Sequence, residues 1–277
     1  MVVGAANAGM LKPGVLLEAA IDAVSAAREE IRSGRPAPIR VDPKGARDLV
    51  SEVDLAVERK LRGLLARRTP DIGFLGEEEG REDRSTEAFW VLDPIDGTVN
   101  FVRGLPLCAV ALALIHRDRP VLGVIDLPFL DLRYSAFADE GAHLNGRRLK
   151  VSSTAALSQA VVALGDFAVG PGFESKNRLR FEVATRVASV ALRVRMLGSA
   201  AVDLAWLAEG RLDASILLSN RPWDVAAGVV IAREAGARVV DVDGSEHTLG
   251  SSATLAATPA LIDQLVATVQ RSIEVLC

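Results

Sequence analysis

The sequence predicts an α/β protein in which an α+β lobe is followed by an α/β lobe. In the first half, three apolar segments between residues 107 and 137 are separated by short polar stretches, which predicts a meander of strands. In the second half, helical and strand patterns alternate from residue 177 to the C-terminus. The composition, 49% hydrophobic and 25% charged over 277 residues, is that of an ordinary globular protein with a full core.

Two helices separated by a loop are predicted at the start of the first lobe. Pro13 and the periodic apolar residues after it predict a helix over residues 13–34, with Gly34 as its stop. Residues 35–47 are rich in proline and charge, so we expect an exposed, mobile loop that acts as a lid beside Asp48. A second helix follows Ser51, because apolar residues recur on one face at Val53, Val57, Leu61 and Leu64.

Strands complete the first lobe. We expect two of them over residues 72–75 and 89–92, and then the meander over residues 107–115, 121–125 and 132–137. Asn145 and Gly146 form a strong turn signal after the meander.

The second lobe is predicted from alternating patterns. Helices are expected over residues 177–190, 199–209, 223–235 and 259–276, and strands over residues 194–197, 214–218 and 237–241. The segment VSSTAAL at residues 151–157 separates the two rhythms. We therefore expect an N-terminal α+β lobe over residues 1–152 and a C-terminal α/β lobe over residues 153–277, packed as one compact unit.

Charge and cysteine content narrow the classes of partner. The net charge of −4 and pI of about 5.5 argue against nucleic-acid binding, which usually needs a basic patch. No apolar run approaches the ~18 residues of a membrane span, and the N-terminus lacks the basic start of a signal peptide. The two cysteines, Cys108 and Cys277, offer no disulfide framework, so a cytoplasmic location is expected.

Acidic residues gather at the predicted ends of elements. Glu77 begins an acidic run after the strand FLG, Asp93 and Asp96 follow the strand WVL, Asp224 begins a helix, and Asp48 opens the segment DLVSEVD. Each has a simpler interpretation, since Asp224 suits a helix start, the run at 77–79 suits a solvated turn, and Asp48 suits an ordinary polar position.

Asp93 and Asp96 are harder to explain as solvated side chains. In the segment DPIDGT, Pro94 follows the first acid and Gly97 the second, which predicts a rigid turn that holds both carboxylates. Thr98 adds a hydroxyl oxygen to the same turn.

If these acids converge, they need compensation. Two like charges ~4 Å apart repel by about 4 kcal/mol at an effective dielectric near 20. Either some carboxyls are protonated or divalent cations lie among them, and all-oxygen ligation favours Mg²⁺, Mn²⁺ or Ca²⁺. A bridging Asp93 between two ions ~3.5–4 Å apart would form a clamp for phosphoryl transfer.

The motifs that carry these acids resemble those of the inositol monophosphatase family. The similar segments are DLVSEVD at 48–54, GEE at 76–78, WVLDPIDGTVNF at 90–101, LGSAAVDLAWLAEGRLDA at 197–214 and WDVAAG at 223–228. They occur in the family's order and cover nearly the whole chain. The resemblance implies a layered αβαβα sandwich shared with the fructose-bisphosphatase superfamily, and Mg²⁺-dependent hydrolysis of a phosphate monoester.

Residue roles follow from the same resemblance. It implies two or three Mg²⁺ ions, with Mn²⁺ as a substitute, held by Glu77, Asp93, the Ile95 carbonyl, Asp96, Thr98 and Asp224. It implies that Asp48, Thr98 and Glu77 act in catalysis, with Asp48 and Thr98 orienting the attacking water. Substrate contacts would come from Asp96, Gly97, Thr98, Ala200, Leu217 and Arg221. It also implies a homodimer and inhibition by Li⁺.

Two positions depart from the family pattern. Ser51 replaces the commoner threonine and keeps the hydroxyl, whereas Leu217 replaces a glutamate that bonds a substrate hydroxyl in inositol-hydrolysing relatives. Arg221 stands where this family varies. The substrate is therefore expected to be inositol monophosphate or a related polyol or sugar phosphate, with fructose bisphosphate, histidinol phosphate or a nucleotide 3′-phosphate as alternatives. A non-catalytic binding protein on the same fold is the other class, disfavoured because every metal-binding acid is present; a P-loop kinase is excluded because the motif G-x-x-x-x-G-K-[ST] does not occur.

Overall fold

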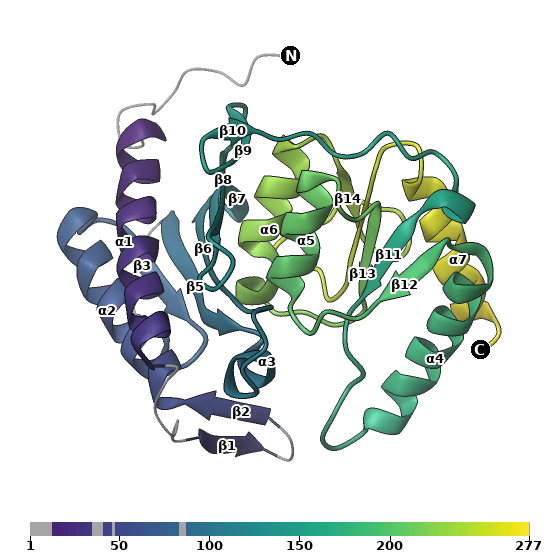
Figure 1. The fold of residues 1–277 in the computed structure, drawn as a ribbon, viewed down its shortest axis with the longest axis horizontal. Helices are drawn as coiled ribbons and strands as arrows, with labels where there is room; N and C mark the ends of the chain where they lie inside the picture. Colours follow the sequence, from purple (N-terminus) through teal and green to yellow (C-terminus); the bar gives the residue numbers. More distant parts are fainter. Residues whose placement is uncertain (1–12, 35–40, 46–47, 83–86, 277) are drawn as a thin grey trace.

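A computed structural model describes residues 13–34, 41–45, 48–82 and 87–276, with only the backbone described over residues 41–45 and 48–50. Figure 1 shows five layers, in which helix pairs alternate with two β-sheets. Helices α1 (Pro13–Gly34) and α2 (Glu52–Arg68) form one outer layer, α5 (Ala200–Glu209) and α6 (Pro222–Glu234) the middle layer, and α4 (Phe173–Val190) and α7 (Ile262–Glu274) the other outer layer. The expected αβαβα sandwich is thus confirmed. None of the helices in the described residues has the length and apolar composition needed to cross a membrane.

The first sheet has eight strands in the order β10-β9-β8-β7-β6-β5-β3-β4. Their bounds are β3 (Gly73–Gly76), β4 (Gly80–Arg81), β5 (Ala88–Asp96), β6 (Ala109–His116), β7 (Arg119–Leu127), β8 (Leu132–Phe137), β9 (Gly141–Leu144) and β10 (Arg147–Arg148). Strands β5 to β9 pair antiparallel in sequence order, which confirms the predicted meander, and only β3 and β5 pair parallel. Asn145 and Gly146 turn the chain between β9 and β10 with positive φ angles of 48° and 83°.

The second sheet has five strands in the order β12-β11-β13-β15-β14. Strands β11 (Val161–Leu164), β12 (Arg193–Arg195) and β13 (Ala214–Leu217) are parallel, whereas β15 (Thr254–Ala257) runs antiparallel to both β13 and β14 (Arg238–Val240). The sequence patterns indicated β12, β13 and β14 but not β11 or β15. Both missed strands are runs of only four residues, all buried or nearly so, which periodicity cannot separate from other apolar segments.

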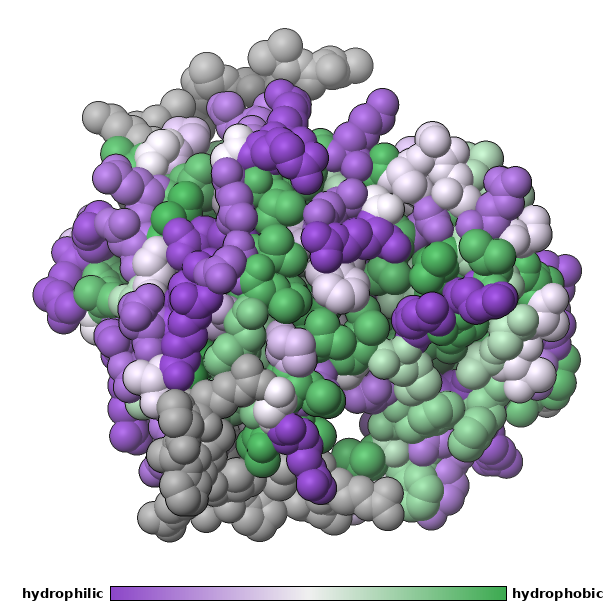
Figure 2. All heavy atoms as spheres, viewed as in Figure 1, coloured by the Kyte–Doolittle hydropathy of each residue, from purple (hydrophilic) through white to green (hydrophobic). Residues whose placement is uncertain are grey.

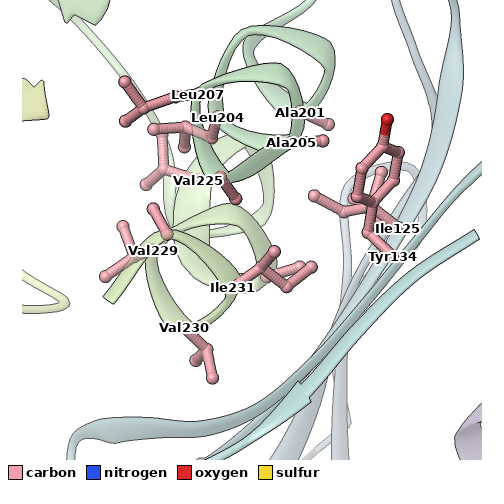
Figure 3. Packing of buried hydrophobic residues seen from close by; sticks show 14 of the residues in the cluster. Ile125, Tyr134, Ala201, Leu204, Ala205, Leu207, Val225, Val229, Val230 and Ile231 are labelled. Carbon is pink, nitrogen blue, oxygen red and sulfur yellow. The ribbon is translucent and has the colours of Figure 1, made fainter. Parts of the chain in front are cut away.

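Three apolar cores lie between the layers. One packs α1 and α2 against the eight-stranded sheet, and another packs α4 and α7 against the five-stranded sheet. The central core joins both sheets through α5 and α6. In Figure 3, Ile125 and Tyr134 from the first sheet face Ala201 and Ala205 of α5 and Ile231 of α6. Residues from both halves of the chain therefore share one core.

One predicted element is wrong in part. The proline-rich segment expected to be a mobile loop contains a strand, β1 (Val41–Gly45), which pairs antiparallel with β2 (Asp48–Ser51). Pro43 is compatible with this two-stranded ribbon because each strand has an open edge. The rest of the predicted lid, residues 35–40 and 46–47, lies outside the described residues.

Candidate metal-dependent active site

The first two acids lie at the C-terminal end of strand β5, where its pairing with β6 becomes irregular. Asp93 pairs with Ala111 of β6 and Asp96 pairs with Ala109, so three steps along β5 match two along β6. The extra residue is a β-bulge, which bends a strand and re-aims its side chains. Gly97 follows with φ of 86° and opens the short helix α3 (Thr98–Val102). Strand β5 therefore extends to Asp96, four residues beyond the predicted end.

Asp93 is the most deeply buried of these acids. Its side chain is 3% exposed, and its Oδ1 atom is buried without a hydrogen-bond partner. Burial raises the pKa of Asp93 well above its ordinary value, and the charges of Glu77, Asp96 and Asp224 raise it further. The four acids drawn from three separate stretches of sequence thus lie within electrostatic range of one another, as the motifs predicted.

Asp96 is held by the N-terminus of α5. Its Oδ2 atom accepts hydrogen bonds of 2.6 Å from the Ser199 hydroxyl and 2.6 Å from the Ala201 N–H. Burial raises the pKa of Asp96 to about 6, although these two hydrogen bonds favour the charged form. The carboxylate is therefore fixed by a helix about a hundred residues further along the chain.

Asp224 lies in the first turn of α6. Its Oδ2 atom accepts a hydrogen bond of 2.7 Å from the Arg221 N–H, and burial raises its pKa to about 7. Gly228 in the same helix allows α6 to pack closely on α5, because a Cβ atom there would lie 2.6 Å from the Leu204 Cβ atom. The glycine of the WDVAAG motif therefore serves the packing that brings Asp224 within electrostatic range of Asp96 and Glu77.

Glu77 begins the turn between β3 and β4. Its N–H donates a 3.2 Å hydrogen bond to the Leu92 carbonyl, which ties the turn to β5 one residue before Asp93. Glu77 and Glu78 are thus only partly exposed and the turn is anchored to the sheet, whereas Glu79 is exposed.

Thr98 lies beside two acceptors. Its hydroxyl is 3.1 Å from the Ile95 carbonyl and 3.5 Å from the Asp54 carboxylate. A hydroxyl has one proton to donate, so the nearer carbonyl is the better acceptor in this arrangement. Asp48 is the first residue of β2, where its backbone pairs with Gly45, and its side chain lies outside the described part of the structure.

The predicted substrate residues lie in different surroundings. Gly97 is adjacent to Asp96, Ala200 is the first residue of α5, and Arg221 is exposed next to the start of α6. Leu217 ends β13 and is only 4% exposed within the central core. The side chain at position 217 is therefore apolar and buried, and it cannot accept a hydrogen bond from a substrate hydroxyl.

Comparison with known proteins gives the family. The model of the inositol monophosphatase family matches residues 13–274. The chain belongs to the inositol monophosphatase family. Inositol monophosphatase 1 of Solanum lycopersicum is 38% identical over 265 residues, which cover 92% of this chain and 95% of that protein.

Two further relatives extend the comparison. The fructose-1,6-bisphosphatase/inositol-1-monophosphatase of Thermotoga maritima is 34% identical over 230 residues, covering 83% of this chain and 86% of that protein. Among solved structures, a Thermotoga maritima IMPase superposes with a TM-score of 0.87 at 30% identity, covering 95% of this chain and 99% of that one. The family's fold therefore extends over almost the whole of this chain.

The residues of this family member suit a divalent cation of the magnesium type. The available donors are carboxylate, carbonyl and hydroxyl oxygens, and the buried Oδ1 atom of Asp93 has no protein partner. Across the described residues, no three acidic, histidine or cysteine side chains stand close enough to ligate one ion directly. The Oδ2 atoms of Asp96 and of Asp224 accept hydrogen bonds from the protein, and the Ile95 carbonyl and bound water are the oxygens that would complete a magnesium shell.

Four residues of the site were not assigned a role from the sequence. Ser199 holds Asp96, Asp54 approaches Thr98, Glu58 accepts hydrogen bonds from the turn after Glu77, and Asp203 is buried on α5. Asp203 has an Oδ1 atom without a partner, and burial raises its pKa well above the ordinary value, with Asp96 adding to the effect. Its one visible signal was the spacing of three residues from Ala200, which places both on one face of a helix.

Proposed function

We propose that this chain hydrolyses phosphate monoesters of small polyols with the help of two or three Mg²⁺ ions, for which Mn²⁺ can substitute. The observation that carries the proposal is the group of acids around Asp93, where burial and the neighbouring charges of Glu77, Asp96 and Asp224 oppose ionisation of Asp93 unless cations are present. Membership of the inositol monophosphatase family supports the reaction class, phosphoric monoester hydrolysis.

Five oxygen donors would hold the ions: the side chains of Glu77, Asp93, Asp96 and Asp224, and the carbonyl of Ile95. When bound, the ions supply charge neutralisation, polarisation of the phosphate and a water of lowered pKa. The pKa values of Asp96 and Asp224 are raised to about 6 and about 7, so both carboxyls take up protons as the pH falls below neutral, and a cation that binds there competes with those protons.

The chain's other residues orient the reactants. Asp48 and Thr98 would accept and position the proton of the attacking water, and the N–H groups of Gly97 and Thr98 would donate to the phosphate oxygens. Ala200, Leu217 and Arg221 would line the side on which the alcohol leaves. Glu77 would join Asp48 and Thr98 in catalysis through the ion that it binds.

The choice of substrate differs among members of the family, since relatives are named for inositol phosphate and for fructose bisphosphate. A site built to bond a hydroxyl discriminates strongly, whereas an apolar wall discriminates weakly. Buried Leu217 therefore favours a broader range of alcohols, and fructose bisphosphate is a second candidate because the Thermotoga maritima relative is named for both activities.

The decisive experiment is release of phosphate from a panel of inositol, sugar, polyol and nucleotide monophosphates, with Mg²⁺ and with EDTA. We expect hydrolysis that requires the metal and is lost in Asp96→Asn, which removes one metal-binding charge at constant size. Arg238→Gln is the matched surface control, since Arg238 pairs with exposed Asp263 on β14 and α7. Full activity in EDTA would refute the metal-dependent mechanism.

We also propose that the protein is a cytoplasmic homodimer without nucleic-acid or membrane partners. Each subunit would consist of two lobes, residues 1–152 and residues 153–277. An apolar surface on α4 and β12 supports the dimer, because Phe181, Val190, Leu192 and Met196 are exposed beside the edge strand of the five-stranded sheet. Figure 2 has green, hydrophobic atoms over this part of the molecule, interrupted by hydrophilic side chains. The reducing location is supported by the use of only two cysteines.

A further inference from the structure

A buried carboxylate on α2 holds the turn that begins with Glu77. Glu58 is completely buried, and its two oxygens accept hydrogen bonds of 2.9 Å from the Glu78 N–H and 2.9 Å from the Glu79 N–H. Backbone N–H groups that point at a carboxylate form charge-assisted hydrogen bonds, which are shorter and stronger than neutral ones. The main chain directly after Glu77 is therefore fixed to α2.

The glycine of the GEE motif makes this contact possible. A Cβ atom at Gly76 would lie 2.1 Å from Oε1 of Glu58, so no other residue leaves room for the carboxylate. On the other side, the Glu77 N–H is bonded to the Leu92 carbonyl of β5. The backbone at Glu77 is thus bonded to β5 through its own N–H, and the next residue is bonded to α2.

The charge of Glu58 is compensated locally. Arg62, one turn further along α2, donates 2.9 Å to Oε1 of Glu58 and 3.1 Å to the Gly80 carbonyl. Its guanidinium also lies 4.4 Å from the centre of the Phe74 ring. The buried Glu58 carboxylate thus accepts from three donors, the Glu78 and Glu79 N–H groups and Arg62, and is satisfied. Arg62 also bonds the last residue of the turn through the Gly80 carbonyl.

We propose that Glu58 is a positioning residue for the metal site, which fixes the backbone directly after Glu77 through the Glu78 and Glu79 amides so that the Glu77 carboxylate is presented to Asp93. This inference rests on the proposed role of Glu77 as a metal ligand. Helix α2 thereby supports the site at two places, through Asp54 in its first turn, which lies near Thr98, and through Glu58 one turn further along. Replacing Glu58 should weaken metal binding more than it weakens the fold.

The test is Glu58→Gln, which keeps the size of the side chain but turns an amide NH₂ toward one of the two backbone N–H groups. In the metal-free protein, we expect faster hydrogen exchange at the Glu78 and Glu79 amides. In calorimetric titration with Mg²⁺, we expect an affinity about tenfold weaker, the scale on which groups behind metal ligands act. The kcat at saturating Mg²⁺ should return to near the wild-type value.

Asp213→Asn is the matched control. Asp213 is also a buried carboxylate that accepts a backbone N–H, 2.7 Å from Val161, but it lies between β11 and the segment before β13. It should lose thermal stability and bind Mg²⁺ as the wild type does. If Glu58→Gln fails to fold, Arg62→Met perturbs the same turn from the partly exposed side, and a weaker Mg²⁺ affinity is expected there too.

The outcomes separate the two proposals. Wild-type Mg²⁺ affinity in Glu58→Gln, or in Arg62→Met where that variant is used, would overturn the positioning role, even if the variant were less stable. A wild-type protein that neither binds nor needs Mg²⁺ would instead overturn the proposed function. Weakened binding in both Glu58→Gln and Asp213→Asn would mean that general loss of stability explains the effect, which also overturns the positioning role.

Discussion

Removing the charge of Asp93 should stabilise the metal-free protein, although Asp93 is buried and most substitutions at buried positions destabilise. The side chain is 3% exposed, has one oxygen without a partner and is surrounded by other carboxylates. Asp93→Asn keeps the shape of the side chain and removes a carboxyl whose ionisation costs free energy in the folded state. The variant should therefore gain stability and lose the metal site together.

The size of the gain follows from the raised pKa. The folded protein keeps a proton on Asp93 at a pH where the unfolded chain, with an ordinary value of 3.8, has released it. Such a group costs stability as pH rises, by about 1.4 kcal/mol for each pH unit between its unfolded and folded pKa values. An asparagine amide finds imperfect hydrogen-bond partners among these carboxyls, so we expect a gain of about 2 kcal/mol, or roughly 4–8 °C in Tm.

The assay is thermal or urea unfolding of both proteins in EDTA at several pH values. The difference should be largest near pH 7 and should shrink toward pH 4, where the unfolded aspartate also becomes protonated. Saturating Mg²⁺ should reverse the order, because a ligand at about 100 times its Kd stabilises the wild type by ~2.7 kcal/mol and the variant gains little.

Asp126→Asn provides the control with the opposite sign. Asp126 is fully buried on β7 but accepts hydrogen bonds from Arg28 and Arg133, so its charge is compensated. Breaking that cluster should cost about 3 kcal/mol or more. A loss of stability in Asp93→Asn that does not change with pH or Mg²⁺ would refute the account of Asp93 as an acid whose burial requires cations.

Three further predictions concern inhibition, specificity and assembly. Li⁺ at tens of millimolar (about 10–50 mM) should inhibit hydrolysis by competing with Mg²⁺, and indifference to Li⁺ would count against a standard family site. Leu217→Glu should raise kcat/KM for myo-inositol 1-phosphate relative to glycerol phosphate by about tenfold, or ~1.4 kcal/mol, and an unchanged ratio would show that residue 217 does not meet the alcohol. Phe181→Glu on the exposed face of α4 should shift the protein from dimer to monomer in light scattering, whereas the same size before and after would remove that face from the interface.

The sequence predicted the acids better than their supports. Asp93 and Asp96 were recognisable because the proline and glycine around them are local and because carboxylates need compensation wherever they lie. The contact of Ser199 with Asp96 spans 103 residues, and no spacing in the chain encodes it. Glu58 looked like any charged position on a helix, since its burial depends on a turn that packs over α2 only in the folded protein.

The fold was predictable where an element carries its own signals. Helix α1 begins and ends at the predicted residues because Pro13 and Gly34 mark its ends. Strands β11 and β15 were missed because four-residue apolar runs have no caps, and their identity comes from pairing with β13. The strand at Val41–Gly45 was expected to be part of a loop, because the three prolines and several charges of residues 35–47 outweigh a pairing partner that lies only a few residues further along the chain.

The supports of the acids come from outside the group that they hold. Asp96 is bonded to the N-terminus of α5, Asp224 to the first backbone N–H before α6, and the turn of Glu77 to α2. Each donor favours the ionised carboxylate or fixes its main chain, yet together they leave the acids repelling one another through Asp93. Helices α5 and α6 are anchored in the central core and α2 in the core on the other side of the eight-stranded sheet, so that repulsion cannot be relieved by moving one element without unpacking another. A site of this kind keeps its shape before the cation arrives, and the loss of any one support should weaken cation binding without collapsing the other two.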